Sequence, residues 1–274
     1  MTMLQRRLDT LPSTGITGSR VSNQFGRIVL AFMLRDMRTR FGRSYVSYLL
    51  SIGWPLVHLL VMFIAYLLTH KIAPIGDDPS VFAATGLAPY ILALYPARFT
   101  AMAAFQNKQL LLFPIVSPFQ LILARAILEA ISAFFVFIIF FFGLVLMGLA
   151  EPPPDVYLAS VVIVATIYFS IGLGVFGVVL CSFHFLIGIL TIIFFVIGLY
   201  LASGAIIPMS LVPPAIKNIL WYNPLYQAVG LLRSAYFGGF NADTYSVSYI
   251  VLVASGLLML GLGGERLVRG RFLT

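Results

Sequence analysis

The sequence is poor in charge. Of its 274 residues only 17 are Lys or Arg and 9 are Asp or Glu, whereas roughly a quarter of the residues in a soluble globular chain are charged. Because 61% of the residues are hydrophobic, these few charges cannot cover a water-facing surface. The composition excludes both a soluble globular protein and a disordered polar chain. It indicates an integral membrane protein.

Other shortages exclude classes of chemistry. The single cysteine, Cys181, cannot form an internal disulfide, and three scattered histidines give no metal-ligand spacing, so we expect no metal site and no catalytic residues. None of the three lysines completes a G-x-x-x-x-G-K-[ST] motif, so the chain cannot bind ATP by a P-loop. Gly172, Gly174 and Gly177 match the G-x-G-x-x-G dinucleotide pattern, but they lie in a long apolar run, where we interpret them as helix-packing positions.

Long stretches without Asp, Glu, Lys or Arg separate the charges. A membrane-spanning helix needs about 20 apolar residues, and residues 44–69, 79–97, 130–150, 156–216 and 244–264 qualify. The fourth stretch is too long for one span, and we divide it at Cys181-Ser182-Phe183-His184, its least lipid-like point. We therefore predict an all-α membrane protein with six transmembrane helices, at about 45–69, 81–104, 123–149, 156–180, 185–206 and 244–264.

Basic residues fall mostly on one side of these spans. Lys71, Lys217 and Arg233 lie on one side, and the remaining Lys and Arg lie on the other. Basic residues are retained in the cytoplasm, so both termini are predicted to be cytoplasmic. The first 43 residues hold no apolar signal-peptide region, so we expect the first span to act as the insertion signal. This topology and attraction to anionic lipids account for the net charge of +8, and no nucleic-acid partner is expected.

The first 43 residues divide into two parts. Residues 1–20 are polar and rich in Gly, Ser and Thr, and are predicted to be a flexible cytoplasmic tail. In residues 21–43 apolar side chains recur every three or four positions opposite several arginines, which predicts an amphipathic helix at the inner membrane surface. Asp36 projects from the apolar side, and we expect it to pair with Arg40.

Two polar residues inside the predicted spans allow two interpretations each. His58 in the first span is either a packed hydrogen-bonding residue or a ligand or proton relay, and the first is favoured because no carboxylate is near it in the span. Glu129 opens the third span one turn after Arg125, and it is interpreted as half of a structural pair in preference to a proton-coupling acid.

The loop between the second and third spans is the most distinctive. Residues 106–118 begin with polar side chains, continue with an apolar run and end with two prolines four residues apart. This segment is too short to span a membrane and too apolar to lie in water, so either a protein partner covers it or it packs under its own spans. A helix covered by a partner is typical of the coupling helix of a transporter, and the candidate coupling residues are Gln106, Asn107, Lys108, Leu110, Leu111, Leu112, Phe113 and Pro114.

Residues 207–243 interrupt the apolar sequence before the last span. Prolines and glycines divide this segment into two short helices, one from about Pro214 to Tyr222 and one capped by Asn223 with Pro224 at its first position. Neither is long enough to cross a core of about 30 Å. We predict a re-entrant pair that enters and leaves the outer leaflet and lines a conduit.

Four motifs stand out along the chain: Leu34-Arg35-Asp36-Met37-Arg38-Thr39-Arg40-Phe41-Gly42, Gly86-Leu87-Ala88-Pro89, Ala124-Arg125-Ala126-Ile127-Leu128-Glu129 and Leu220-Trp221-Tyr222-Asn223-Pro224-Leu225. Together they resemble the permease subunits of ABC exporters of the ABC-2 type, and among them those of capsular polysaccharide exporters. Relatives usually carry an acid where this chain has Trp54, and a base where it has Ser117. The first departure removes a charged contact in the conduit, and the second leaves Leu110 to Phe113 as the main ATPase contact.

The resemblance implies a homodimer in the bacterial inner membrane with two cytoplasmic ATPase subunits, which would bind ATP and Mg. It also implies a lipid-linked polysaccharide as substrate, and periplasmic and outer-membrane proteins that continue the route. Exporters of O-antigen or teichoic acid share this architecture and stay open as alternatives. An ion-coupled transporter and a membrane-embedded enzyme are disfavoured, because the chain lacks clustered intramembrane acids.

Two further sets of residues are assigned to the substrate. Guanidinium groups pair with phosphate or carboxylate oxygens, so an anionic glycan would meet the arginines at the cytoplasmic mouth, although lipid anchoring explains them equally. Those arginines are Arg35, Arg38, Arg40 and Arg43. Aromatic residues near the span ends could stack on sugars or form an interfacial belt. The candidates for the conduit are Tyr45, Tyr48, Trp54, Tyr222, Tyr226, Arg233 and Tyr236.

Overall fold

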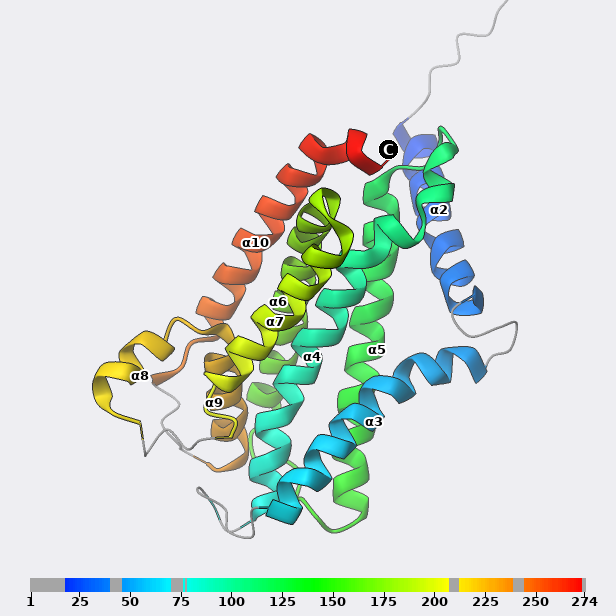
Figure 1. The fold of residues 1–274 in the computed structure, drawn as a ribbon. Helices are drawn as coiled ribbons and strands as arrows, with labels where there is room; N and C mark the ends of the chain where they lie inside the picture. Colours follow the sequence, from blue (N-terminus) through cyan, green and yellow to red (C-terminus); the bar gives the residue numbers. More distant parts are fainter. Residues whose placement is uncertain are drawn as a thin grey trace, which may run out of the picture.

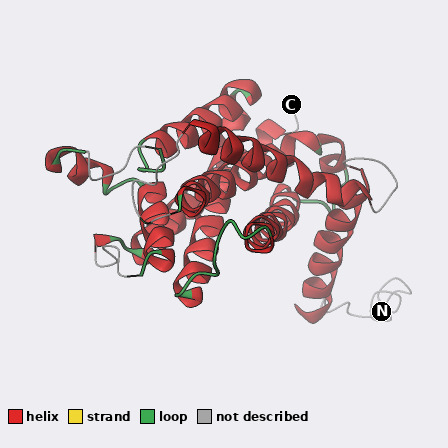
Figure 2. Ribbon diagram, turned by 90° about the horizontal axis from the view of Figure 1, so that it is seen from below, coloured by secondary structure: helices red, strands yellow, loops and turns green. Residues whose placement is uncertain are grey.

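The computed structural model describes residues 18–39, 46–69, 76, 78–206, 212–238 and 244–272, and within these ranges the chain forms helices joined by turns and contains no strand (Figure 2). This part of the chain confirms the predicted all-α class. In chain order the elements are α2 (Gly18–Thr39), α3 (Val46–Thr69), α4 (Pro79–Gln106), η1 (Lys108–Leu112), α5 (Pro118–Leu146), α6 (Val156–Phe183), α7 (Phe185–Leu201), α8 (Pro214–Leu220), α9 (Pro224–Tyr236), α10 (Val247–Val268) and η4 (Arg269–Phe272).

Five helical segments in the described ranges are long and apolar enough to cross a membrane. They lie in α3, α4, α5, α6 and the continuous stretch of α10 and η4. The apolar helix α7 has 17 residues, which at 1.5 Å per residue is about 26 Å, slightly less than a typical hydrocarbon core. The structure therefore contains five long apolar helices and a shorter one, in the order predicted for the six spans.

The division of the long charge-free stretch is confirmed. Helix α6 ends at Phe183 and α7 begins at Phe185, so that His184 alone joins them. The His184 side chain accepts a hydrogen bond from the Ile187 amide and caps α7. A Cβ on Gly188 would lie 2.6 Å from the Cys181 backbone nitrogen, so the absence of a side chain there lets the two helices turn back closely.

Helix α6 lies at the centre of the bundle because its glycines admit neighbouring helices. A Cβ on Gly172 would lie 2.5 Å from the Ala254 carbonyl oxygen of α10, and one on Gly174 would lie 2.8 Å from the Ala97 carbonyl oxygen of α4. The glycines of the apparent dinucleotide motif are thus helix-packing positions, as predicted, and none of them opens a helix.

The connecting segments gather at two ends of the bundle. Figure 1 places the beginning of α2, η1, the α6–α7 turn and η4 together at the top, which we call the loop end. There Phe105 contacts Phe185 and Phe272, with ring centroids 5.4 and 5.6 Å apart. Helices α8 and α9 lie in the lower half of Figure 1, and we call this the α9 end.

Helix α2 lies beside the upper part of α5 (Figure 1). Val29 is buried and Phe32 packs against the cluster of apolar residues at the loop end, whereas Arg27 and Arg38 are exposed. The predicted amphipathic pattern is therefore confirmed for residues 24–38. Asp36 projects from the inward side, as expected, and is buried.

Candidate functional site

The segment between α4 and α5 is held at both ends by side-chain caps. Asn107 ends α4, and its side chain donates to the Ala103 carbonyl at 2.9 Å. Ser117 caps α5 and forms a reciprocal capping box with Gln120, while Pro118 takes the first helical position. Between these caps lies the 3-10 helix η1. The predicted helical loop is therefore present, in a tighter form of five residues.

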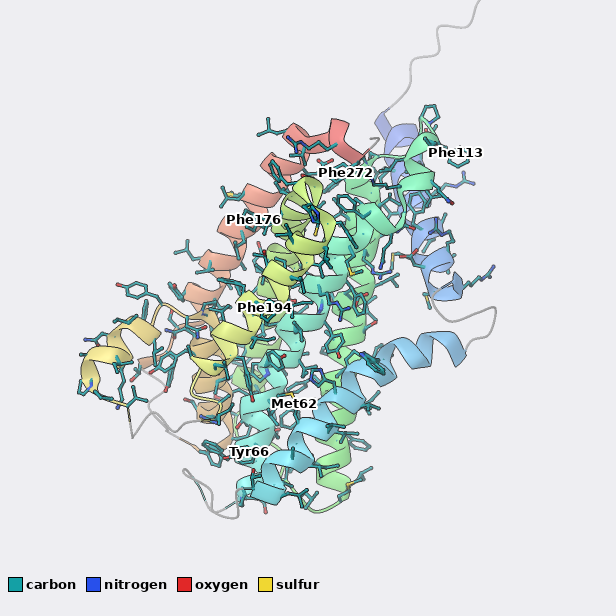
Figure 3. The ribbon with its side chains drawn as sticks, viewed as in Figure 1. Met62, Tyr66, Phe113, Phe176, Phe194 and Phe272 are labelled. Carbon is teal, nitrogen blue, oxygen red and sulfur yellow. The ribbon has the colours of Figure 1, made fainter. Side chains whose placement is uncertain are left out.

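Exposure divides the apolar run of this loop into two sets. Leu112 is 75% exposed, Phe113 58% and Ile115 63%, and Figure 3 shows Phe113 at the outer edge of the molecule. Leu111 is buried against Leu121, Val268 and Phe272. The sequence treats Leu110 to Phe113 as one contact surface, but Leu111 belongs to the packing of the bundle. The exposed large apolar side chains of this loop are Leu112, Phe113 and Ile115, which we call the docking surface because a partner is predicted to cover it.

A cavity of about 190 Å³ lies beside this loop, between it and the C-terminal turn. It is lined by Leu111, Val116, Pro118, Arg269, Gly270 and Phe272. Arg269 is fixed at its rim because Nε and Nη2 donate to both carboxylate oxygens of Glu265, at 2.8 and 3.1 Å. The Glu265 side chain is buried, as is that of Glu129. The spacing of Glu265 and Arg269, four residues apart with the acid first, is a sequence signal that predicts this pair.

A cluster of polar residues around Arg125 joins three elements at the loop end. Arg125 on α5 is buried, and its guanidinium lies 2.9 Å from Asp36 on α2 and 3.1 Å from Glu129 one turn later on α5. It also donates to Gln106, the last residue of α4, at 3.3 Å. The expected structural pair of Arg125 and Glu129 is therefore confirmed, and it has a further partner in Asp36.

Arg35 extends the cluster to the beginning of the loop. Its Nη2 donates to the Asn107 side-chain oxygen, and it lies 3.7 Å from Asp36. We call Arg35, Asp36, Gln106, Asn107, Arg125 and Glu129 the Arg125 cluster. Of the predicted arginines at the mouth, Arg35 belongs to this cluster and Arg38 is exposed. Arg40 and Arg43 lie outside the described residues. The predicted pair of Asp36 with Arg40 is therefore untested.

A second buried arginine organises the α9 end. Arg233 on α9 donates to the carbonyl oxygens of Gly204 and Ala205 at 2.7 and 3.1 Å, and its guanidinium carbon lies 3.8 Å from the centre of the Phe82 ring. These carbonyls follow the end of α7, where helical partners are missing. A Cβ on Gly86 would lie 3.1 Å from the guanidinium, so Gly86 leaves the space that Arg233 occupies.

The two short helices of the predicted re-entrant segment lie where the sequence places them. Asn223 caps α9 by accepting from the Leu225 amide at 2.9 Å, and it donates to the Leu199 carbonyl at 2.7 Å. The fully buried Gln227 links the Trp221 carbonyl to the Ser246 amide. Helix α8 is the more exposed of the two.

The predicted conduit residues do not share one surface. Trp54 and Tyr222 are 66% and 69% exposed, whereas Tyr226 and Arg233 are buried and Tyr236 packs against Phe141. Tyr48 lies in α3 but its side chain is outside the described set, as is the whole of Tyr45. The exposed aromatics are thus free to meet lipid, a second copy or substrate, while Tyr226, Arg233 and Tyr236 build the α9 end.

Several tyrosines that no sequence pattern distinguished are buried between helices. His58 Nδ1 lies 3.0 Å from the Tyr95 hydroxyl, which confirms its interpretation as a hydrogen-bonding residue between helices. The rings of Tyr90 and Tyr200 stack with centroids 4.4 Å apart. Tyrosines in an apolar sequence resemble an interfacial belt, so only packing reveals that these face one another.

Comparison with known proteins identifies the family of this chain. The ABC-2 type transporter family matches residues 28–237, which include the Arg125 cluster and α9. The polysialic acid transport protein KpsM of Escherichia coli is 28% identical over 249 residues, covering 90% of this chain and 95% of that protein. The capsule polysaccharide export inner-membrane proteins CtrC of Neisseria meningitidis serogroup B and BexB of Haemophilus influenzae are 27% and 26% identical, each covering 86% of this chain and 89% of its own length. The family match covers more than half of the sequence, and the chain therefore belongs to the ABC-2 type transporter family.

Proposed function

We propose that this protein is the permease subunit of an ATP-driven exporter that moves lipid-linked capsular polysaccharide out of the cytoplasm across the inner membrane. The observation that carries the proposal is the match to three kinds of capsule transport protein over most of both chains. The absence of a P-loop from the sequence requires that a separate subunit hydrolyse ATP.

The proposed assembly is a homodimer with two cytoplasmic ATPase subunits, which bind ATP and Mg. In this assembly α7 completes six spans, and both termini lie in the cytoplasm with the loop end. The basic side chains Lys108, Arg266, Arg269 and Arg271 support this orientation, because positive residues at span ends are retained in the cytoplasm. Periplasmic and outer-membrane proteins would continue the route.

The ATPase is proposed to contact the docking surface, Leu112, Phe113 and Ile115. ATP-driven closure of the two ATPase subunits would push on residues 106–118 and tilt α3, α4 and α7, opening a channel between the two permease copies. The proposal is supported by apolar side chains that protrude at the loop end without cover from the described residues of this chain.

This contact predicts loss of assembly when the docking surface is made acidic. Leu112→Asp with Phe113→Asp should abolish co-purification with the ATPase, because both side chains are exposed and the fold does not depend on them. The matched control is Ile219→Asp at the α9 end, where the side chain is 72% exposed. Intact co-purification of the double variant would contradict the assignment. Leu111 is not a suitable position, because its replacement would disturb the bundle.

At the other end, α8 and α9 are proposed to be the re-entrant pair that roofs the channel. Their lengths of 7 and 13 residues, about 10 and 20 Å, support this because neither crosses the membrane. Trp54 and Tyr222 are the exposed aromatics best placed to meet a sugar face.

The anionic substrate is proposed to meet Arg38 together with Arg40 and Arg43 at the cytoplasmic mouth. Arg38 is exposed in α2, where a guanidinium can pair with phosphate oxygens. Arg38→Ala with Arg40→Ala should slow export of the glycan and leave assembly with the ATPase intact. If export is unchanged, the proposed substrate contact is wrong, and these arginines serve only to anchor α2 to lipid.

The proposed function is tested in lipid nanodiscs that contain the permease with the ATPase encoded beside it. ATP hydrolysis should require both subunits and change when lipid-linked capsular glycan is added. If the permease neither recruits the ATPase nor alters its hydrolysis, the proposal is wrong, and transport driven by an ion gradient becomes the function to examine.

A further inference from the structure

We infer that Arg125 is a positioning residue that couples movement of residues 106–118, which we call the docking loop, to the N-terminal helix α2. The inference rests on the proposed function, because it assumes that ATP-driven force enters through the docking loop. It goes beyond that function by naming the side chains that carry the movement from the loop to α2.

The first argument is connectivity. Arg125 is bonded both to Gln106, where α4 ends and the loop begins, and to Asp36 on α2, which is 89 residues away in the sequence. Arg35 makes a second link in parallel, from α2 to Asn107, which caps α4. Helix α2 is thus joined to both residues at the base of the docking loop.

The second argument concerns the charges. Asp36, Arg125 and Glu129 are all buried, so none can separate from its partners without a strong electrostatic penalty. Arg125 has two carboxylate partners, however, and one of them is on its own helix. If α2 moves and Asp36 is withdrawn, Glu129 still neutralises Arg125, and Asp36 still has Arg35 within 3.7 Å. The contact between α2 and α5 can therefore open without leaving an unpaired charge.

The third argument is the position of Glu129 beside the prolines of α3 and α4. Glu129 borders a small cavity of about 10 Å³ together with Pro55 of α3 and Pro96 of α4. Each proline removes a backbone hydrogen bond from its helix, so these are the places where α3 and α4 bend with least resistance. The Arg125 cluster thus adjoins α2, the docking loop and the flexible positions of two spans.

The experiment compares two isosteric substitutions in the complete permease–ATPase complex in nanodiscs. Asp36→Asn weakens the link between α2 and α5 but keeps the pair within α5. Glu265→Gln is the matched control, because it weakens a buried ion pair with Arg269 at the same end of the bundle, outside the Arg125 cluster. We expect Asp36→Asn to lower the amount of glycan moved per ATP roughly tenfold, within the usual range of coupling effects, while ATP hydrolysis stays near that of the unmodified complex. Glu265→Gln should change the ratio much less.

A spectroscopic readout separates coupling from mere stability. In a Cys181→Ser background, a spin label at Arg27→Cys, an exposed position of α2, reports the surroundings of that helix. ATP binding should change the mobility of the label in the unmodified complex, and this response should be lost with Asp36→Asn. Arg125→Lys, which keeps the charge but cannot reach three partners, should lose it too.

The outcomes distinguish this inference from the proposed function. If the unmodified permease fails to recruit the ATPase, the proposed function fails. If the unmodified complex transports glycan and Asp36→Asn transports it with the same yield per ATP, or its label still responds to ATP, the inference is wrong. Equal losses of transport and hydrolysis in Asp36→Asn, with less folded complex, would also overturn it, because they indicate a structural role alone.

Discussion

The two ends of the molecule each bury one arginine, and they stabilise it in different ways. Arg125 at the loop end is paired with two carboxylates from two helices, whereas Arg233 at the α9 end donates to two backbone carbonyls and lies over an aromatic ring. Carboxylate partners neutralise a charge and can exchange with one another. Backbone carbonyls are fixed by the chain, so Arg233 holds one geometry. The loop end thus stabilises its arginine by pairing it with charges, and the α9 end stabilises its arginine by backbone and ring contacts of one fixed geometry.

The largest effect is expected from removing Arg125. Arg125→Met leaves Asp36 and Glu129 buried without their cation, which should lower the free energy of unfolding by about 3–5 kcal/mol. Arg233→Met should cost about 2–3 kcal/mol, because a carbonyl is less costly to leave unpaired than a carboxylate. Thermal unfolding in detergent, followed by loss of the monodisperse peak, measures both. Adding Asp36→Asn and Glu129→Gln to Arg125→Met should restore much of the stability; a triple variant as unstable as Arg125→Met would contradict the account.

Replacing each of the two arginines by lysine tests the same comparison and should change the free energy of unfolding by an intermediate amount. Arg125→Lys keeps the charge beside two carboxylates and should cost about 1 kcal/mol, whereas Arg233→Lys loses the planar group that serves two carbonyls and the Phe82 face and should cost about 2 kcal/mol. The ranking, measured by unfolding midpoints in the same detergent, is the critical result. If lysine is tolerated better at position 233 than at position 125, the distinction between charge neutralisation and fixed geometry fails.

The smallest change in stability is expected from a substitution in α6, which runs between the two ends of the bundle. Gly174→Ala would place a methyl group 2.7 Å from the Thr100 Cβ and 2.8 Å from the Ala97 carbonyl oxygen, so that α4 must shift, at a cost of about 1–2 kcal/mol. Gly198→Ala in α7 is the matched control, because nothing lies within 4 Å of the added atom, and it should change stability by less than about 0.5 kcal/mol. Similar unfolding midpoints for the two variants would show that the close contact of α4 and α6 is not required.

Local sequence features predicted the helices well where each has its own signal. Asn223-Pro224 gives a capping residue and a proline at the first helical position, and α9 begins there. His184 interrupts an apolar run, and α6 and α7 meet at it. The membrane core requires helices in any apolar stretch of sufficient length, so the class of fold followed from composition. The docking loop was recognisable because apolar residues between polar ones and prolines are unusual at a span end.

Side-chain partners were less predictable, because many residues of each type compete. Local spacing favours a pair of Asp36 with Arg40, which lies outside the described residues. It gives no signal of Arg125, on another helix, against which the structure places Asp36. Leu111 and Leu112 are indistinguishable in the sequence, and only the direction of η1 buries one and exposes the other. The tyrosines of the predicted conduit divide in the same way, because a ring gains free energy from either packing or interfacial exposure.

The sequence by itself determined that this is a helical membrane protein whose sequence holds no P-loop motif, where its helices break, and which loop carries an exposed apolar surface. These properties depend on composition and on spacing within one helical turn, which the chain specifies locally. Only the tertiary structure decided that Arg125 meets Asp36, that Arg233 closes the end of α7, and that Leu111 turns inward. Those contacts of the two arginines join residues 28 to 89 positions apart, and they form because a buried charge must find whichever partner the packing of helices brings within reach.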